Sequence, residues 1–412
     1  MRVLIVGGGA REHAFAWRLH QAGHEVWAAP GNAGLEAVAR RVPTAARAEQ
    51  LLPLLRRERI ELTVIGPEAP LVAGLADGLR AGGAAVLGPC AAAAQIEASK
   101  SWARELCRRH GLPGPEATRC APEAAPGFAA GCPLPVAIKA DGLMAGKGVV
   151  IARSRPEAAA AAARLAAHGP VLFEEFLEGR EISAFALCDG RRAACSGIAR
   201  DHKRLGAGDT GPMTGGMGAF CPVPDVSPAE ERAAHGILQA AVTALEAEGR
   251  PFVGFLFAGL MLTAAGPRVL EFNCRFGDPE AQSLLPLLQG DPAPQWLRAA
   301  QGRLEAQEQV RFQPGCALGV VLAAPGYPEA PRPGQAIPGL RADGQPAAGG
   351  LVFHAAASRD GLWRTAGGRI LTAVGRGPTL AAARQEAYAT AAAVAFPGAL
   401  YRRDMGDPGG QA

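Results

Sequence analysis

Short apolar runs alternate with amphipathic segments along the first hundred residues. Four runs rich in Val, Ile, Leu and Ala have the length of strands, at residues 3–6, 24–29, 61–66 and 84–88. Segments with helical spacing lie between them, ending near Leu19 and covering residues 51–60 and 71–83. Strands that alternate with helices predict βαβ units around a parallel sheet. Ligands of such sheets bind beyond the carboxyl ends of the strands, so we expect the four loops that follow these strands to meet at one edge.

The pattern becomes less regular in the middle of the chain. Helices are predicted at residues 101–111 and 158–167, and strands at residues 136–140, 149–154, 254–262 and 268–276 and within residues 171–179. Residues 112–135 are rich in Pro and Gly and are interpreted as a link and candidate hinge, and residues 205–220 as a glycine-dense loop. Beyond Ala317, short strands within residues 317–328, 351–357 and 368–377 precede a last helix over residues 379–395. We therefore expect three domains, at residues 1–100, 101–316 and 317–412, the last a small α+β domain.

Composition narrows the class of partner. The net charge is +4 and charged residues make up 19% of the chain without a block of like charge, which gives no reason to expect a nucleic acid or an anionic membrane. Nine cysteines are scattered without a Cys-x-x-Cys pair, which favours a reducing compartment over a disulfide framework or a zinc cluster. The chain enters a strand at once, and no apolar stretch reaches the roughly 18 residues of a membrane span. We expect a cytoplasmic protein that does not enter the membrane.

The stretch "DGLMAGKGVV", residues 141–150, looks like a phosphate-binding loop but is not a P-loop. Only three residues separate Gly142 from Gly146, and Gly148 stands where a P-loop has the Ser or Thr that meets Mg²⁺. The loop lies between two predicted strands, which is the arrangement of a glycine flap that closes over phosphates. Lys147 would supply charge there. Lys139, at the end of an apolar strand, is costly to bury unless it meets an anion.

Two acidic segments are candidates for the rest of a nucleotide site. Glu174 and Glu175 interrupt an apolar run, where strand backbone could read a base and an acid could take a ribose hydroxyl; a solvated linker is the alternative. Glu271 and Asn273 are two apart on a predicted strand, so both project from one face, which Val269 and Arg275 are expected to share. Carboxylate and amide oxygens are the ligands that Mg²⁺ prefers. An edge strand with a wet face is the alternative.

The loops after the first strands suggest a second binding region. Gly7 and Gly9 follow a strand, but Glu12 stands where the dinucleotide fingerprint has its third glycine. Glycines at a helix N-terminus can bind an anion, although a tight turn explains them as well. Glu68 suits an amine or a sugar hydroxyl, and capping of the following helix is its alternative role.

Together these segments resemble the ATP-grasp superfamily and, more closely, the phosphoribosylamine–glycine ligase family. The resemblance runs over essentially the whole chain, through "GGGAREHA", "APGNAG", "GPEAPLV", "QIEASK", "IKADGLMAGKGV", "EEFLEGREIS", "DHKR", "DTGPMTGGMGA", "GFLFAGLM", "EFNCRFGDPE", "VFHA" and "GGRIL". It implies an α/β multidomain fold: an N-terminal parallel βαβ domain, a central ATP-grasp unit whose mobile lid lies within about residues 121–177, and a small C-terminal α+β domain.

The resemblance also implies a role for each motif residue. ATP would be bound by Lys100, Lys139, Gly142, Gly146, Lys147, Gly148, Glu174, Glu175, Phe176, Leu177 and Glu181, with Glu174 to Leu177 at the adenine and Glu181 at the ribose. Glu271 and Asn273 would hold Mg²⁺ or Mn²⁺. The substrates would contact Gly8, Gly9, Arg11, Glu12, Asn32, Glu68, Asp209, Thr210, Gly211, Thr214, Gly215, Gly216, Arg275 and Asp278. Arg275, Lys147 and Asp278 are the implied catalytic residues.

The implied activity is ligation of glycine to 5-phosphoribosylamine at the expense of ATP, through glycyl phosphate, in de novo purine biosynthesis, by a monomer. Gly8 and Met213 depart from the family pattern, which has Asn at both positions. Another ATP-grasp ligase or carboxylase is the nearest alternative. A non-catalytic ATP-binding regulator is disfavoured by the presence of Glu271 and Asn273, and a dehydrogenase is suggested by Gly7 and Gly9 alone.

Overall fold

The computed structural model describes residues 1–144 and 148–407 of the chain. Its N-terminal domain is built on a five-stranded parallel sheet with strand order β3-β2-β1-β4-β5. The strands are β1 (Arg2–Gly7), β2 (Glu25–Pro30), β3 (Arg40–Arg41), β4 (Leu62–Ile65) and β5 (Val86–Leu87). All four apolar runs form strands of this sheet, so the prediction of a parallel βαβ domain is confirmed.

The helices of this domain include two that were not predicted, at residues 33–37 and 91–98, and one predicted helix is divided. They are α1 (Ala10–Gln21), η1 (Ala33–Ala37), α2 (Ala48–Glu58), α3 (Glu68–Val72), α4 (Leu75–Ala81) and α5 (Ala91–Ala98). The single helix expected over residues 71–83 is wrong, because α3 and α4 are separate. Gly74 lies between them with φ +82°, a left-handed conformation that interrupts the helical hydrogen bonds and that glycine adopts without a steric penalty.

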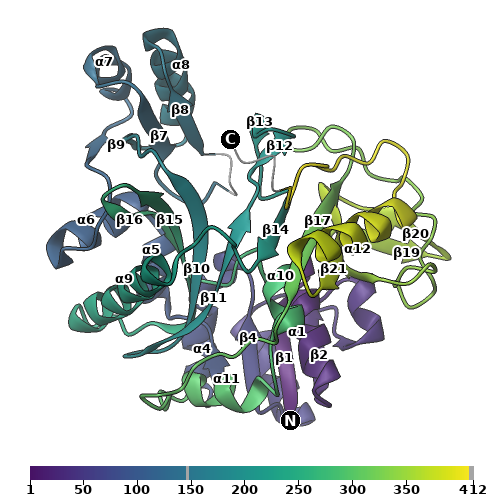
Figure 1. Cartoon of the computed structure of the whole chain (residues 1–412). Helices are drawn as coiled ribbons and strands as arrows, with labels where there is room; N and C mark the ends of the chain where they lie inside the picture. Colours follow the sequence, from purple (N-terminus) through teal and green to yellow (C-terminus); the bar gives the residue numbers. More distant parts are fainter. Residues whose placement is uncertain (145–147, 408–412) are drawn as a thin grey trace.

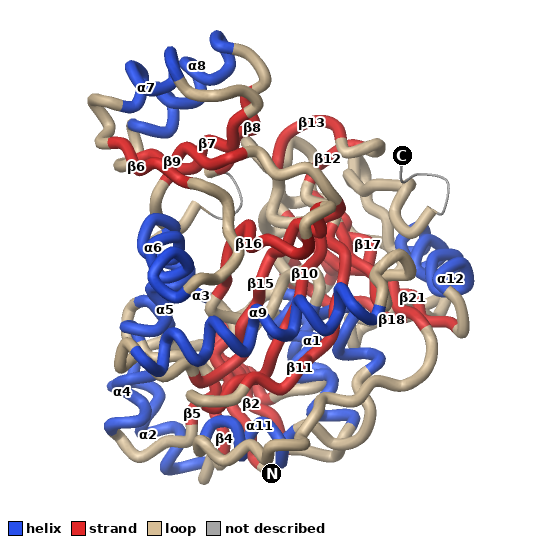
Figure 2. Tube along the Cα trace, turned by 60° about the vertical axis from the view of Figure 1, so that its left-hand side comes forward, coloured by secondary structure: helices blue, strands red, loops and turns tan. Residues whose placement is uncertain are grey.

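A small unit, residues 117–175, stands apart from the rest of the molecule (Figures 1 and 2). It follows α6 (Lys100–His110) and has a four-stranded sheet in the order β6-β9-β7-β8, covered by two helices. Its elements are β6 (Ala117–Cys120), α7 (Ala125–Gly131), β7 (Val136–Ala140), β8 (Val149–Ala152), α8 (Arg155–Ala166) and β9 (Val171–Glu175). Residues such as Ala125, Ile138 and Phe173 form a core of its own.

Residues 112–135, interpreted as a link and candidate hinge, contain secondary structure that was not predicted, and the hinge stays a prediction. That segment contains β6 and α7, and both pack into the core of the small unit. Cys120, Ala125, Ala129 and Cys132 are the buried residues that anchor it. Their spacing is too short and too mixed with Pro and Gly for a helix or strand period to be recognised in the sequence.

An eight-stranded sheet forms the centre of the molecule, in the order β16-β15-β10-β11-β14-β17-β21-β18. Its members are β10 (Arg180–Asp189), β11 (Ala193–Asp201), β14 (Gly218–Cys221), β15 (Val253–Thr263), β16 (Gly266–Asn273), β17 (Cys316–Ala323), β18 (Leu351–His354) and β21 (Arg369–Gly377). β14 pairs with β17, so the sheet continues from the central domain into the C-terminal one. The sequence did not predict β10 and β11, which lie in the middle of the sheet.

Two short hairpins extend from this sheet. β12 (Arg204–Gly206) pairs with β13 (Thr210–Met213), and β19 (Ala357–Asp360) pairs with β20 (Leu362–Thr365). The segment expected as one glycine-dense loop therefore holds a hairpin and the start of β14. The remaining helical segments are α9 (Pro228–Ala247), α10 (Ala281–Leu284), η2 (Leu285–Leu287), α11 (Ala293–Ala300) and α12 (Leu380–Ala393).

Different helices pack on the two faces of the central sheet. Alternate residues of β10 point to opposite faces: Ala184 packs in the core that includes α9, and Phe185 in the core that includes α1 and α11. On the second face, Phe15 of α1 stacks on Phe255 and meets Trp296 edge-on at 5.5 Å between ring centroids. This aromatic contact fixes the N-terminal domain against the central sheet. Among the described residues, no helix has both the length and the apolar character needed to cross a bilayer.

A bulge in β16 changes which residues share a face. Leu260 of β15 pairs with Val269, whereas Gly259 pairs with Glu271, so Leu270 is an extra residue in the strand. Val269 therefore lies in the core, while Glu271 projects from the other face. The expectation that Val269 shares a face with Glu271 is wrong. Glu271 and Asn273, beyond the bulge, keep the same side.

Candidate active site

A cleft of about 1210 Å³ opens where the small unit, the central sheet and the two terminal domains meet. Most of the predicted site residues line it: Gly9, Arg11, Glu12, Glu68, Lys100, Lys139, Gly142, Gly148, Glu174, Glu175, Phe176, Leu177, Glu181, Asp209, Thr214, Gly215, Glu271, Asn273, Arg275 and Asp278. Gly8, Asn32, Thr210, Gly211 and Gly216 do not line it. Gly146 and Lys147 lie outside the described residues. Two of the four loops expected at one edge, those after β1 and β4, reach the cleft.

Lys139 meets a buried carboxylate at the base of the small unit. Its Nζ lies 2.7 Å from Glu174 Oε2 and donates to the Leu270 carbonyl oxygen at 3.0 Å. Arg104 of α6 donates to the other oxygen of Glu174 at 2.6 Å, and the Glu174 side chain is only 2% exposed. Burial opposes the charge of Glu174, but Lys139 and Arg104 outweigh it and lower the pKa of this carboxyl. The anion that the buried lysine requires is thus present within the chain itself.

Glu271 lies among several cations at the floor of the cleft. Lys203 Nζ is 3.6 Å from Glu271 Oε1 and also pairs with Glu181. Burial works against ionisation of Glu271, but Lys203, Lys139, Lys100 and Arg275 lower its pKa to about 2. Burial lowers the pKa of Lys100, whose Nζ donates to the Gly142 carbonyl oxygen at 2.8 Å. Three lysines thus act on one ionised carboxylate, while Lys139 is also paired with Glu174 and Lys203 with Glu181.

Asn273 follows Glu271 on the same face and has unused hydrogen-bonding capacity. Its Oδ1 accepts from Arg275 at 3.2 Å, and its buried Nδ2 has no partner among the described residues. No cluster of three or more His, Cys, Asp or Glu in that part of the chain is arranged to hold a metal ion. One carboxylate and one amide oxygen fit Mg²⁺, which commonly takes one or two protein ligands and completes its shell with phosphate oxygens and water.

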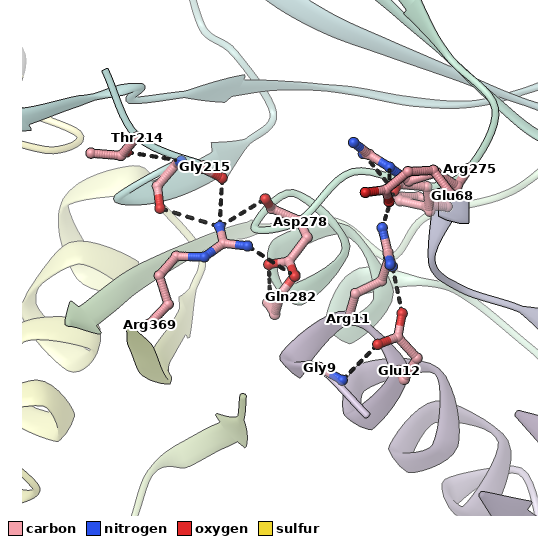
Figure 3. Close-up of polar contacts among 12 residues, drawn as sticks. Gly9, Arg11, Glu12, Glu68, Thr214, Gly215, Arg275, Asp278, Gln282 and Arg369 are labelled. Atoms are coloured by element: carbon pink, nitrogen blue, oxygen red, sulfur yellow. Dashed lines mark hydrogen bonds and ion pairs between the residues drawn. The ribbon is translucent and has the colours of Figure 1, made fainter. Parts of the chain in front are cut away.

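Arg275 joins the floor of the cleft to the N-terminal domain (Figure 3). Its Nε lies 3.3 Å from Glu68 Oε2, and its Nη2 lies 3.0 Å from Glu97 Oε1. Burial disfavours the charged guanidinium, but Glu97 and Glu68 outweigh it and raise the pKa of Arg275. Arg11 donates to the carbonyl oxygen of Phe276 at 3.1 Å, and Arg275 donates to the same oxygen at 3.2 Å. Two arginines from different domains therefore meet at one backbone position.

The glycine turn before β14 is held by an arginine of the C-terminal domain (Figure 3). Arg369 of β21 donates to the carbonyl oxygens of Gly215 at 2.5 Å and Asp278 at 2.9 Å, and it pairs with the Asp278 carboxylate at 3.1 Å. Burial opposes ionisation of Asp278, but Arg369 leads the charges that lower its pKa. Thr214 donates from its hydroxyl to the Lys203 carbonyl oxygen at 2.9 Å. The turn is thus tied to the segments that carry Asp278 and Lys203.

The first loop of the chain is stabilised by its own side chains. Glu12 accepts the Gly9 backbone N–H and the Arg11 guanidinium, each at 2.6 Å, so it supplies the glutamate half of a capping box at the start of α1. Asn32 donates to the carbonyl oxygens of Gly8 and His354 and accepts two backbone N–H groups. All four hydrogen-bonding positions of that amide are used, so Asn32 positions the Gly8 loop, and a contact with substrate stays a prediction.

The remaining predicted residues lie at the mouth of the cleft or outside it. Asp209 is 70% exposed on the β12–β13 hairpin and pairs with the buried Arg402 at 2.5 Å. Thr210 and Gly211 follow it and are exposed. Glu175 is paired with Arg268 at 3.0 Å, and Phe176 lies under the guanidinium of Arg153. Asp209, Glu175 and Phe176 line the cleft, whereas Thr210 and Gly211 do not.

Comparison with known proteins identifies the family. Models of the phosphoribosylglycinamide synthetase family match three successive parts of the chain: the N domain over residues 1–97, the ATP-grasp (A) domain over residues 98–281 and the C domain over residues 317–408. A phosphoribosylamine–glycine ligase of Caulobacter vibrioides is 44% identical over 421 residues, with 98% of each chain covered. This chain belongs to the phosphoribosylamine–glycine ligase family. The resemblance stated from the motifs is confirmed.

Other phosphoribosylamine–glycine ligase relatives support the family and the fold. The human trifunctional purine biosynthetic protein adenosine-3 is 42% identical over 98% of this chain, which spans 42% of the human protein. The crystal structure of a phosphoribosylamine–glycine ligase from Thermotoga maritima is 35% identical, with a TM-score of 0.85 over 98% of this chain and 100% of that one. The biotin carboxylase domain of a Hydrogenobacter thermophilus 2-oxoglutarate carboxylase shares only the fold, at 17% identity and a TM-score of 0.71 over 97% of this chain and 91% of that one.

Several polar residues of this family member were not assigned from the sequence. Arg104, Lys203, Glu97 and Arg369 all line the cleft, and each makes an ion pair there. Lys203 and Arg369 lie within "DHKR" and "GGRIL", two motifs that carried the resemblance, and this was the available signal for them. Glu97 lies within "QIEASK", a third motif of the resemblance, whereas Arg104 lies outside these motifs on α6. Their roles depend on partners about 70 or more residues away in the chain, at Glu174 and Arg275.

In this family member, acid is expected to weaken the fold through Glu271. Its pKa is about 2 in the folded chain against a reference of 4.5, so its stabilising effect is complete above pH 4.5 and is lost as the pH falls toward 2. Without added nucleotide or metal, the free energy of unfolding should drop between pH 7 and pH 3 by about 2 kcal/mol more in the wild type than in Glu271→Gln. Urea titrations at the two pH values measure this difference. Equal losses in both proteins would contradict it.

Replacing Gly216 by Ala should destabilise the chain. Gly216 has φ +105°, and a Cβ there would lie 2.4 Å from Pro279 Cδ and 2.8 Å from Asp201 Oδ1. Strain and overlap together are expected to cost about 2 kcal/mol or more. Gly236→Ala in helix α9 is a matched control, because a Cβ there meets nothing within 4 Å and Ala favours a helix. Thermal unfolding should show a lower midpoint for the first variant and an unchanged or higher one for the second.

Proposed function

We propose that this chain ligates glycine to 5-phosphoribosylamine at the expense of ATP, giving glycinamide ribonucleotide, ADP and phosphate in purine biosynthesis. The family supports this proposal, since it consists of ATP-grasp carboxylate–amine ligases. The observation that carries it is the cleft of about 1210 Å³, which lysines, an ionised Glu271 and motif residues of all three domains line together. We further propose that the chain acts as a monomer. We also propose that it works in the cytoplasm, a reducing compartment that suits its nine free cysteines.

In the first proposed step, a glycine carboxylate oxygen attacks the γ-phosphorus of ATP, the bond to ADP breaks, and glycyl phosphate forms. Lys100, Lys139 and the loop from Gly142 to Gly148 would bind the phosphates, with Lys147 adding charge. Glu174 to Leu177 would line the adenine and Glu181 the ribose. The side chain of Glu174 is occupied by Arg104 and Lys139, so its contact with the base would come from the backbone. We also propose that the small unit acts as the mobile lid that excludes water from the acyl phosphate.

Glu271 and Asn273 would hold a divalent cation, Mg²⁺ or Mn²⁺, against the phosphate oxygens. When bound, the cation neutralises charge on the transferring phosphoryl group. Arg275 would act beside it, because its guanidinium touches Asn273 and faces the same floor of the cleft. The task of these residues is positioning and charge neutralisation, since phosphoryl transfer requires no protein nucleophile.

In the second proposed step, the amine of 5-phosphoribosylamine attacks the acyl carbon and phosphate leaves. Gly9, Arg11 and Glu68 would contact this substrate from the N-terminal domain, and Thr214, Gly215 and Asp278 from the central domain. Arg11 and Arg275 offer charge for its phosphate or for the leaving phosphate. Gly8 and Met213 stand where the family pattern has Asn, so this chain lacks two side-chain amides that could contact this substrate.

ADP formation with each substrate omitted in turn tests the function. The complete mixture of ATP, divalent cation, glycine and 5-phosphoribosylamine should form ADP and the amide together. Bicarbonate or formate in place of glycine should give no ADP, which distinguishes other ATP-grasp enzymes. Nicotinamide cofactors should show no absorbance change. ADP formation that ignores glycine would contradict the proposal.

A further inference from the structure

Two acidic side chains of the cleft have no part in the scheme above. Asp201 ends β11, and Glu280 directly precedes α10. Both line the cleft. Glu280 is 2% exposed and accepts a hydrogen bond from the Ser183 hydroxyl at 2.7 Å. Asp201 has a buried oxygen, Oδ1, that no hydrogen-bond donor meets among the described residues. An unpartnered carboxylate oxygen in a polar cleft needs an explanation.

The backbone places the two carboxyl groups side by side. Ser183 pairs with Ala199 across β10 and β11, so the two residues share a face of the sheet. Asp201 is two residues beyond Ala199 and projects from that same face. Gly216 provides a second link, because a Cβ there would touch both Asp201 Oδ1 and the ring of Pro279, the neighbour of Glu280. The pair thus lies beneath the turn that Arg369 holds.

The charges around the pair come from β10, β21 and two loops, those after β11 and β16. Lys203, Glu181 and Arg369 act on Asp201, and Lys203 and Arg275 act on Glu280. Burial and the nearby Glu280 raise the pKa of Asp201 well above its usual range, against the effect of Lys203. Burial also raises the pKa of Glu280. Two neighbouring carboxyl groups of this kind titrate as a unit, and the raised pKa belongs to the uptake of the first proton by the pair.

The amide-forming step needs a proton acceptor. As the amine nitrogen bonds to the acyl carbon of glycyl phosphate, the bond from that carbon to the phosphate oxygen breaks and the phosphate leaves with the electron pair. The nitrogen, which arrives with two hydrogens, becomes positively charged and must lose one proton to give a neutral amide. We propose that the Asp201–Glu280 pair accepts this proton, with the carboxylate of Asp201 as the receiving group. This inference rests on the proposed function.

Asp201→Asn and Glu280→Gln test the proposal in two parallel reactions. With 5-phosphoribosylamine as the nucleophile, each variant should lower kcat for amide formation by about 10²-fold or more. With concentrated hydroxylamine in its place, each variant should still form glycine hydroxamate at close to the wild-type rate. Activation of glycine does not use the pair, and the small nucleophile can pass its proton to water. A residue that only supports the fold would affect both reactions equally.

The pH profile provides a second measurement. Wild-type kcat for amide formation should fall as the pH drops through the raised pKa of the pair, because the acceptor becomes protonated. In Asp201→Asn, the fall of the residual activity should shift to a lower pH, because Glu280 no longer has an anionic neighbour. Asp189→Asn is the matched control. Asp189 is a buried carboxylate of β10 outside the cleft that accepts backbone N–H groups of Arg191, Arg192 and Leu304, and its loss should not shift the profile.

The outcomes separate the two proposals. Unchanged kcat for amide formation in both variants would overturn the role of the pair. Parallel loss of hydroxamate and amide formation would overturn it as well, in favour of a structural role. Amide formation by the wild type without any hydroxamate would instead reject the acyl phosphate step of the proposed function, and the role of the pair would fall with it.

Discussion

Replacing Glu271 by Ala is expected to lower turnover by about 10³-fold or more while the chain stays folded. Glu271 is the ionised carboxylate on which the charges of Lys100, Lys139, Lys203 and Arg275 converge. Its loss would remove the proposed metal ligand and the carboxylate on which these four cations act. ADP release in the complete reaction mixture measures the effect.

The structure also explains why the fold should survive this change. Lys139 keeps its pairing with Glu174, and Lys203 keeps its pairing with Glu181, so neither lysine is left as an unpaired buried charge. Glu178→Ala is a suitable control, because Glu178 is exposed, lies close in the chain to the predicted adenine segment and does not line the cleft. The control should retain full turnover. Wild-type turnover in Glu271→Ala, or unfolding of that variant, would show that Glu271 has a different role.

Much of this site could be predicted because some residue types are costly in the places where they occur. Lys139 ends an apolar strand, and burial of a lysine requires an anion nearby. Glu271 and Asn273 break an apolar strand in the same way. Such conflicts between a local pattern and the chemistry of a side chain are visible in one sequence. They indicate where a function is placed without showing which residue supplies the partner.

Other features depend on contacts that no local pattern contains. Glu174 reaches Lys139 and Arg104 because β9 lies between β6 and β7 in the small unit, an order that the sequence does not reveal. The bulge at Leu270 depends on the register between β15 and β16, and a one-residue shift moves Val269 to the opposite face. The strands β10 and β11 were missed because their many small residues have no clear alternation. A period of two needs contrast between buried and exposed positions to be recognised.

The position of the C-terminal domain against the central sheet could not be predicted from a local pattern either, and it places a residue at the cleft. The sequence predicted its short strands and its last helix, but not that β17 would pair with β14 and extend the central sheet. This pairing brings β21, and with it Arg369, to the glycine turn of the central domain. An arginine in "GGRIL" could as well face solvent in a different fold. Only the assembled sheet shows that Arg369 bonds the glycine turn at the cleft.

Replacing Arg369 by Gln is therefore expected to lower kcat/KM for glycine and for 5-phosphoribosylamine by about 10²-fold, since a small displacement of positioning groups has an effect of this size. The variant loses the ion pair to Asp278 and bonds to the carbonyl oxygens of Gly215 and Asp278. The free energy of unfolding should fall by about 3 kcal/mol, because the Asp278 carboxylate loses its arginine partner in a largely buried place. Steady-state kinetics with each substrate varied, together with urea unfolding, measure both effects.

The comparison with other variants shows whether Arg369 acts through the turn. Arg364→Gln changes an exposed arginine of β20 that donates to one carbonyl oxygen, so it should alter stability by less than about 0.5 kcal/mol and leave the kinetics unchanged. Arg369→Lys retains a charge near Asp278 but cannot reach several carbonyl oxygens at once, so it should recover stability more than kcat/KM. KM for ATP should change little in either Arg369 variant. The arginine contacts the glycine turn before β14 and not the side chains of Lys100, Lys139 or Lys203. An equal loss for ATP and for the two other substrates would show instead that Arg369 supports the whole cleft.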